Sequence, residues 1–73
     1  MPETDIAHRL AEIDAQIADL ELRIVQQQKR VENLLAKGLD ATGLRSAIAV
    51  MTETLAHLEA NRAELQRHRR SSG

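Results

Sequence analysis

The apolar residues of this 73-residue chain recur at alternating steps of three and four along two long stretches. That spacing places them on one side of an α-helix, whereas a β-strand would need steps of two. The interruptions are Gly38 and Gly43 in the middle of the chain, while the single proline is at position 2. We therefore predict an all-α protein with one domain over residues 1–73, built from two long helices.

The repeat assigns fourteen apolar residues to core positions, and we predict that they form the core and the oligomer interface. The first helix is expected over about 4–37, beginning near Thr4, and the second over about 42–69. The fourteen residues are Ile6, Leu10, Ile13, Ile17, Leu20, Ile24, Val31 and Leu34 on the first helix, and Leu44, Ile48, Met51, Leu55, Leu58 and Leu65 on the second. The tail over 71–73 carries no pattern and is compatible with a tag remnant, so the fold prediction leaves it out.

The segment between the helices, about 38–41, is too short for anything but a tight reversal. Gly38 is expected in the left-handed conformation that ends many helices, with Leu39 folding back on the last turn. Asp40 or Thr42 can cap the second helix. We therefore predict an antiparallel, coiled-coil-like hairpin in which Val31 lies near Ile48.

The distribution of charge supports the same pairing. Residues 1–22 contain six acidic residues and only one arginine, whereas residues 61–70 contain four arginines and one glutamate. In a hairpin these two stretches lie side by side, so their charges cancel. An isolated basic segment would instead indicate an arm that binds nucleic acid.

Two polar residues interrupt the apolar repeat, Gln27 on the first helix and Arg62 on the second. A polar residue at a core position commonly fixes register or oligomeric state at some cost in stability. We predict that role for both. An alternative for Arg62 is an ion pair across the seam with an acidic residue of the first helix.

The apolar surface is wider than two helices need, because further apolar residues flank the main stripe. Left exposed, they would form an adhesive patch. We therefore predict a homodimer in the form of a four-helix bundle, and the alternative is that these residues bind a different protein. The flanking residues are Ala7, Ala11, Ala15, Ala18, Leu22, Val25 and Leu35 on the first helix, with Leu39, Ala47, Ala49, Val50, Ala56, Ala60 and Ala63 beyond it.

Nothing in the sequence indicates catalysis, and we predict a protein that is not an enzyme and has no cofactor, no metal and no catalytic residue. There is no cysteine, no aromatic residue and no glycine-rich phosphate loop. Three histidine–glutamate pairs are spaced by four, which suits a loose surface metal but is more typical of a solvated helix face. These pairs are His8–Glu12, Glu53–His57 and Glu64–His68.

No apolar run approaches the roughly 20 residues that a membrane-spanning helix needs. The acidic start of the chain, MPETDIAHRL, has no apolar segment of the kind found in signal peptides. We therefore expect a cytoplasmic protein that has no membrane partner.

The stretch from Ile24 to Leu65 resembles a group of small, uncharacterised helical-hairpin proteins of alphaproteobacteria. Those proteins have an I-x-x-Q-x-x-x-V/I-x-x-L segment, a short turn with Gly and Asp-x-Thr or Asp-Thr, and a second helix with the pattern L-L/I-x-x-M/F-x-E-x-L/M-x-x-H/L. The resemblance implies the hairpin and no activity. It departs at Gly43, where a capping glutamate is frequent. The matching residues are Ile24, Gln27, Val31, Leu34, Gly38, Asp40, Thr42, Met51, Glu53, Leu55, Leu58, Asn61 and Arg62.

Two classes of function follow from these features. The first is a non-enzymatic protein-interaction, scaffold or modulator protein that acts as a homo-oligomeric helical bundle. The second is a small nucleic-acid-binding regulator of the Rop type, which would use the basic turn end or the arginine-rich tail. The net charge of −1 and the absence of aromatic residues favour the first class.

Overall fold

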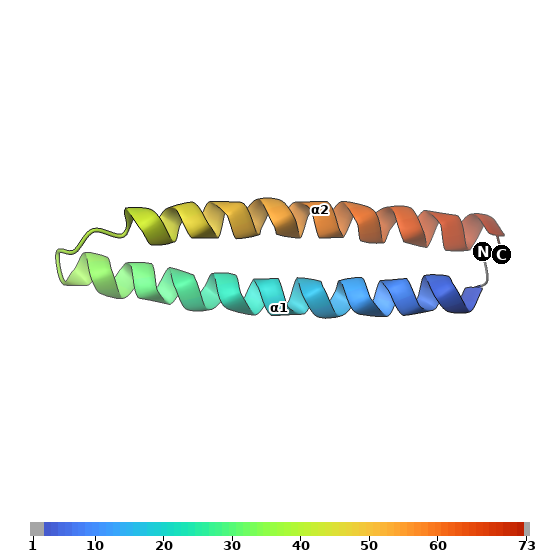
Figure 1. Ribbon diagram of the computed structural model, residues 1–73, viewed down its shortest axis with the longest axis horizontal. Coiled ribbons are helices and arrows are strands. Elements are labelled where there is room, and N and C mark those ends of the chain that lie inside the picture. The colour runs from blue at the N-terminus through green and yellow to red at the C-terminus, as the bar shows by residue number, and fades with distance from the viewer. Residues whose placement is uncertain (1–2, 73) are drawn as a thin grey trace.

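The computed structural model describes residues 3–72, and the side chains of residues 5–71, as two helices joined by a short loop (Figure 1). Helix α1 spans Glu3–Ala36 and helix α2 spans Thr42–Ser72, and residues 3–72 contain no strand. The hairpin is 55 Å long and only 15 by 13 Å across, with both chain ends opposite the loop. The predicted all-α hairpin is confirmed.

The helix ends differ slightly from those expected. Because α1 begins at Glu3, Thr4 lies inside the first turn, and its side chain lies outside the described part of the chain. At the other end, α2 continues to Ser72, three residues past the expected end, and Ser71 Oγ donates a hydrogen bond to the carbonyl oxygen of Arg67 at 3.0 Å. The tail that showed no sequence pattern is therefore helical as far as Ser72.

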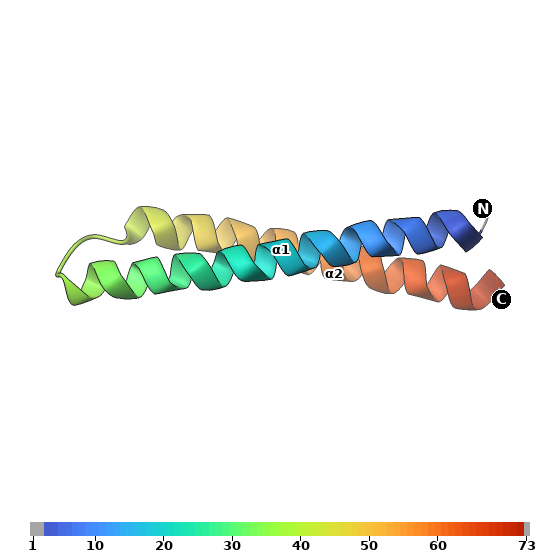
Figure 2. The ribbon, with the colours of Figure 1, turned by 90° about the horizontal axis from the view of Figure 1, so that it is seen from below.

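The helices run antiparallel and cross at a shallow angle near the middle of the hairpin (Figure 2). Ile13 and Leu65 line one surface groove near the chain ends, and Val31 and Ile48 line another near the loop. These pairs fit a single alignment of the two apolar repeats over the length of the hairpin. The expected proximity of Val31 and Ile48 is therefore observed.

Helix α1 ends in a hydrogen-bonded reversal that depends on Gly38. The N–H of Gly38 donates to Leu35 at 3.0 Å and the N–H of Leu39 donates to Leu34 at 2.8 Å, the two bonds of a Schellman motif. The φ angle of Gly38 is 72°, in the left-handed region. The backbone of Leu39 thus folds back as predicted, although its side chain remains 53% exposed.

We expect Gly38→Ala to lower the free energy of unfolding by about 1–2 kcal/mol, because a Cβ is unfavourable at that backbone conformation. Steric contact contributes nothing, since a Cβ at Gly38 would meet no atom within 4 Å. Gly43→Ala is the matched control. Gly43 lies in the first turn of α2 and is equally unobstructed, so alanine should stabilise the helix by about 0.5–1 kcal/mol. Chemical denaturation of both variants measures the difference, and equal effects would contradict this role for Gly38.

Asp40 caps the second helix, which begins at Thr42. Its Oδ1 accepts hydrogen bonds from the backbone N–H of Thr42 at 3.0 Å and from the Thr42 hydroxyl at 2.6 Å. These two bonds, together with the nearby charge of Arg45, lower the pKa of Asp40 below its ordinary value of 3.8. Of the two cap candidates in the sequence, Asp40 is the residue that accepts the helical N–H.

The lowered pKa predicts a pH-dependent contribution from Asp40. A carboxyl group with a lower pKa in the folded state stabilises that state above 3.8 and loses this contribution as the pH falls through the folded-state pKa. Asp40→Ala should therefore be less stable than wild type at neutral pH. The difference should shrink as the pH falls below 3.8. Thermal melts of both proteins across this range test the prediction, which fails if the difference is independent of pH.

Candidate interaction surface

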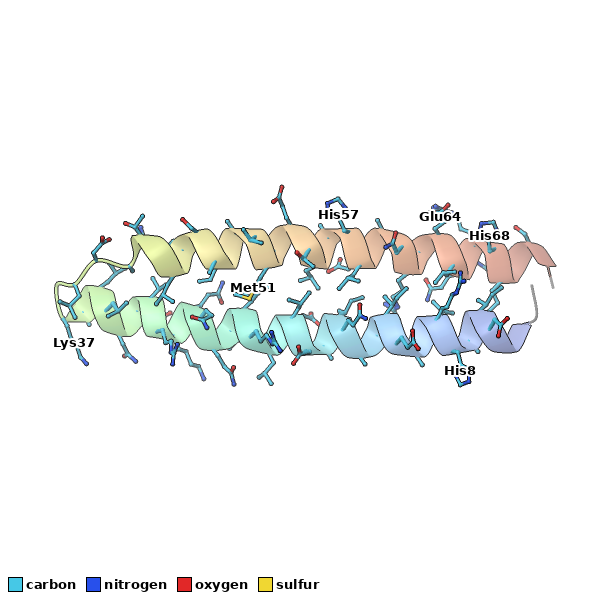
Figure 3. The ribbon with its side chains drawn as sticks, in the orientation of Figure 1. His8, Lys37, Met51, His57, Glu64 and His68 are labelled. Atoms are coloured by element: carbon cyan, nitrogen blue, oxygen red, sulfur yellow. The ribbon has the colours of Figure 1, made fainter. Side chains whose placement is uncertain are left out.

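The residues predicted for the core form a single row between α1 and α2. Ile6, Leu10 and Val31 are buried, at 5%, 8% and 9% exposure. The other eleven are half-buried: Ile13, Ile17, Leu20, Ile24, Leu34, Leu44, Ile48, Met51, Leu55, Leu58 and Leu65. Figure 3 shows the side chain of Met51 in this space between the helices. Two helices can cover one row of side chains only partly, so much of the seam still touches water.

Ala41 is 4% exposed and was not predicted to be buried. It lies in the loop, directly before α2, and its carbonyl oxygen accepts the N–H of Arg45 at 3.0 Å. A lone alanine in a turn belongs to no periodic pattern, so the sequence offered no signal for its burial.

Gln27 occupies the seam position that its spacing predicted, and it is half-buried there. Its Oε1 is buried and has no hydrogen-bond partner among the residues that the structure describes. A buried acceptor that loses its hydrogen bond to water on folding and gains no other destabilises the fold by about 1–3 kcal/mol. Gln27 is therefore an unfavourable residue for the isolated hairpin.

Arg62 differs from Gln27, although both interrupt the repeat. The Arg62 side chain is 46% exposed, and its Nε lies 2.7 Å from Oδ1 of Asp14 on α1. The prediction of a core position for Arg62 is therefore wrong, and the alternative of an ion pair across the seam is observed. The long side chain carries its charge out of the seam to the rim, where Asp14 meets it.

The groove near the chain ends is lined mainly by polar residues of both helices, together with Ile13 and Leu65. Asp19 and Arg23 form an ion pair at 3.0 Å within α1. The polar lining residues are Arg9, Glu12, Gln16, Asn61, Glu64 and His68.

Five large apolar side chains lie exposed on the half of the hairpin nearer the loop. Exposure this high is normal for one isolated residue, whereas five exposed large apolar residues in a hairpin of this size make this half a candidate for contact with a partner. The sequence had placed all five beside the main stripe as candidates for a second contact. They are Leu22 (56% exposed), Val25 (46%), Leu35 (48%), Leu39 (53%) and Val50 (61%).

The three histidines are exposed and lie on the outer surfaces of the helices. His8 points away from α2, while His57 and His68 point away from α1 (Figure 3). Among the described residues, no group of three or more histidine, aspartate or glutamate side chains is placed to hold a metal ion. Within the same residues, neither helix contains a stretch apolar and long enough to cross a membrane.

No family model, curated protein or solved structure matches this chain. The resemblance to the alphaproteobacterial hairpin proteins therefore stays a prediction.

Proposed function

We propose that this chain is a non-enzymatic protein-interaction module that works as a homo-oligomeric helical bundle and serves as a scaffold or modulator of partner proteins. The observation that carries the proposal is the group of exposed leucine and valine residues beside a seam that is itself half-exposed. A second copy of the hairpin would cover exposed residues of this group.

The total surface area supports self-association. The chain exposes 5532 Å², whereas a compact monomer of 8.1 kDa exposes about 4,500 Å². The excess of about 1,000 Å² is close to the roughly 800 Å² that each partner buries in a stable protein–protein interface. One twofold contact would therefore give each chain the exposure of an ordinary folded protein of its mass.

The alternative proposal, a nucleic-acid-binding regulator, draws on the arginines near the end of α2. Arg62 is already paired with Asp14, which reduces the positive charge available to phosphate groups. The chain also has no aromatic side chain on which a base could stack.

Light scattering coupled to size-exclusion chromatography tests the main proposal. We expect a mass of about 16 kDa or more, at least twice the 8.1 kDa of one chain. A folded species of 8.1 kDa at every concentration would contradict it. Fluorescence anisotropy with labelled RNA and DNA tests the alternative, and tight binding that weakens steeply with added salt would replace our proposal.

A further inference from the structure

We propose that the hairpin dimerises through the outer face of α1, packed antiparallel against the same face of a second copy. This inference rests on the proposed self-association and adds which surface is used and in which direction the chains run. We name this surface the outer stripe, defined by Ala11, Ala15, Ala18, Leu22 and Val25.

The outer stripe is a second apolar line on α1. Its members follow one another at steps of four, three, four and three, the same rhythm as the seam, and all five are exposed. Because seven residues make nearly two helical turns, Ala15 and Leu22 follow the line of His8. Figure 3 shows His8 pointing away from α2. The outer stripe therefore faces away from the seam, and a partner can cover it while α1 and α2 stay packed.

The order of residues along the stripe favours an antiparallel partner. The three alanines come first and the larger Leu22 and Val25 come last. Antiparallel packing places Ala18 opposite the partner's Leu22 and Ala15 opposite the partner's Val25, so each large side chain meets a small one. Parallel packing would set large against large and leave gaps between the alanines, which close-packed interfaces avoid.

The charge of α1 supports the same direction. Its first part is acidic and its second part is basic, so a parallel partner brings the two acidic parts together over their whole length, whereas an antiparallel partner does so only near Asp19 and Glu21, at the centre of the contact. Such charges fix orientation more than they add affinity. Residues 3–21 contain Glu3, Asp5, Glu12, Asp14, Asp19 and Glu21 against Arg9, and residues 22–37 contain Arg23, Lys29, Arg30 and Lys37 against Glu32. Near the middle of the stripe, Asp19 is paired with Arg23 in its own helix.

Helix α2 offers a weaker surface. It also carries exposed alanines, but Val50 is its one large exposed apolar residue among those described. A contact centred on α2 would leave both Leu22 and Val25 in water. The outer stripe of α1 therefore exposes two large apolar residues, against one on α2.

The variant Ala18→Glu, Leu22→Glu places charge in the outer stripe and should weaken dimerisation about tenfold or more, measured by sedimentation equilibrium. Ala56→Glu, Ala60→Glu is the matched control, because both alanines are exposed and spaced by four, like Ala18 and Leu22, but lie on α2. Its dissociation constant should stay within about twofold of wild type. Dissociation caused by the α2 variant and not by the stripe variant would overturn the assignment.

Distances between spin labels test the geometry of the dimer, and this experiment introduces no charge into the outer stripe. The chain has no cysteine, so Asp5→Cys and Asn33→Cys each give one labelling site beside the stripe. Mixed dimers of the two labelled proteins should show a short distance, roughly 20 Å, from label 5 to label 33 of the other copy. Dimers of the Asp5→Cys protein alone should show about 45 Å.

A short distance within dimers of the Asp5→Cys protein would mean that the two copies of α1 run parallel. Long distances in both samples would mean that the dimer uses a different surface. Either result overturns this inference while leaving self-association intact. A monomeric mass for the wild-type chain would instead contradict the proposed function itself. These labels also decide the question if the charged stripe variant fails to fold.

Discussion

Replacing Leu10 by alanine should lower the free energy of unfolding by about 2–3 kcal/mol at a fixed protein concentration. Leu10 is 8% exposed, among the most deeply buried side chains in the described hairpin. Alanine would leave a cavity that two straight helices cannot close without shifting along their length. For a chain of 73 residues such a loss is a large part of the total stability.

The matched control is His8→Ala, two residues earlier on the same helix. His8 is exposed and points away from α2 (Figure 3), so its removal should change stability by less than about 0.5 kcal/mol. Urea denaturation followed by circular dichroism measures both variants. Similar losses at the two positions would refute the assignment of Leu10 to the seam.

Replacing Gln27 by leucine should raise the free energy of unfolding by about 1–2 kcal/mol. The substitution removes a buried oxygen that has no hydrogen-bond partner in the described part of the chain, and it adds apolar surface to the seam. If Gln27 also disfavours other registers and oligomeric states, the variant should populate more than one oligomeric mass. Thermal melts and light scattering on the same samples measure the two effects.

The neighbouring Gln28 supplies the control, because it is the same residue type and is exposed. Gln28→Leu should leave stability within about 0.5 kcal/mol of wild type. A lower melting temperature for Gln27→Leu would mean that the amide finds a partner in the assembled protein that the single hairpin does not provide. Gln27 would then belong to the interface between copies.

Sequence periodicity predicted the seam well because it reports where each Cα lies on a helix. All fourteen apolar residues assigned from spacing are buried or half-buried, and Gly38 ends α1 through the hydrogen bonds that its residue type indicated. The limit of the same reasoning is Arg62. Its Cα follows the repeat, but the long side chain carries the guanidinium out to Asp14, and spacing alone does not describe where a flexible side chain ends.

The surface proposed for the contact between copies is harder to predict from sequence than the seam. The flanking residues Leu22, Val25 and Leu35 were identified as surplus apolar surface, and they are exposed. Spacing did not say which polar residues of the two helices would share a groove, because that depends on how far each helix rotates about its own axis in the hairpin. The polar groove near Ile13 and Leu65 became visible only once both helices were in place.

The central claim is that the hairpin is stable because a second copy covers its exposed apolar surface. The dependence of the melting temperature on protein concentration tests this most directly, since association stabilises the folded state by mass action. We expect the melting temperature to rise by about 5–10 °C over a roughly hundredfold increase in concentration. A cooperative transition at the same temperature throughout that range would show that one hairpin folds alone, and would contradict the account.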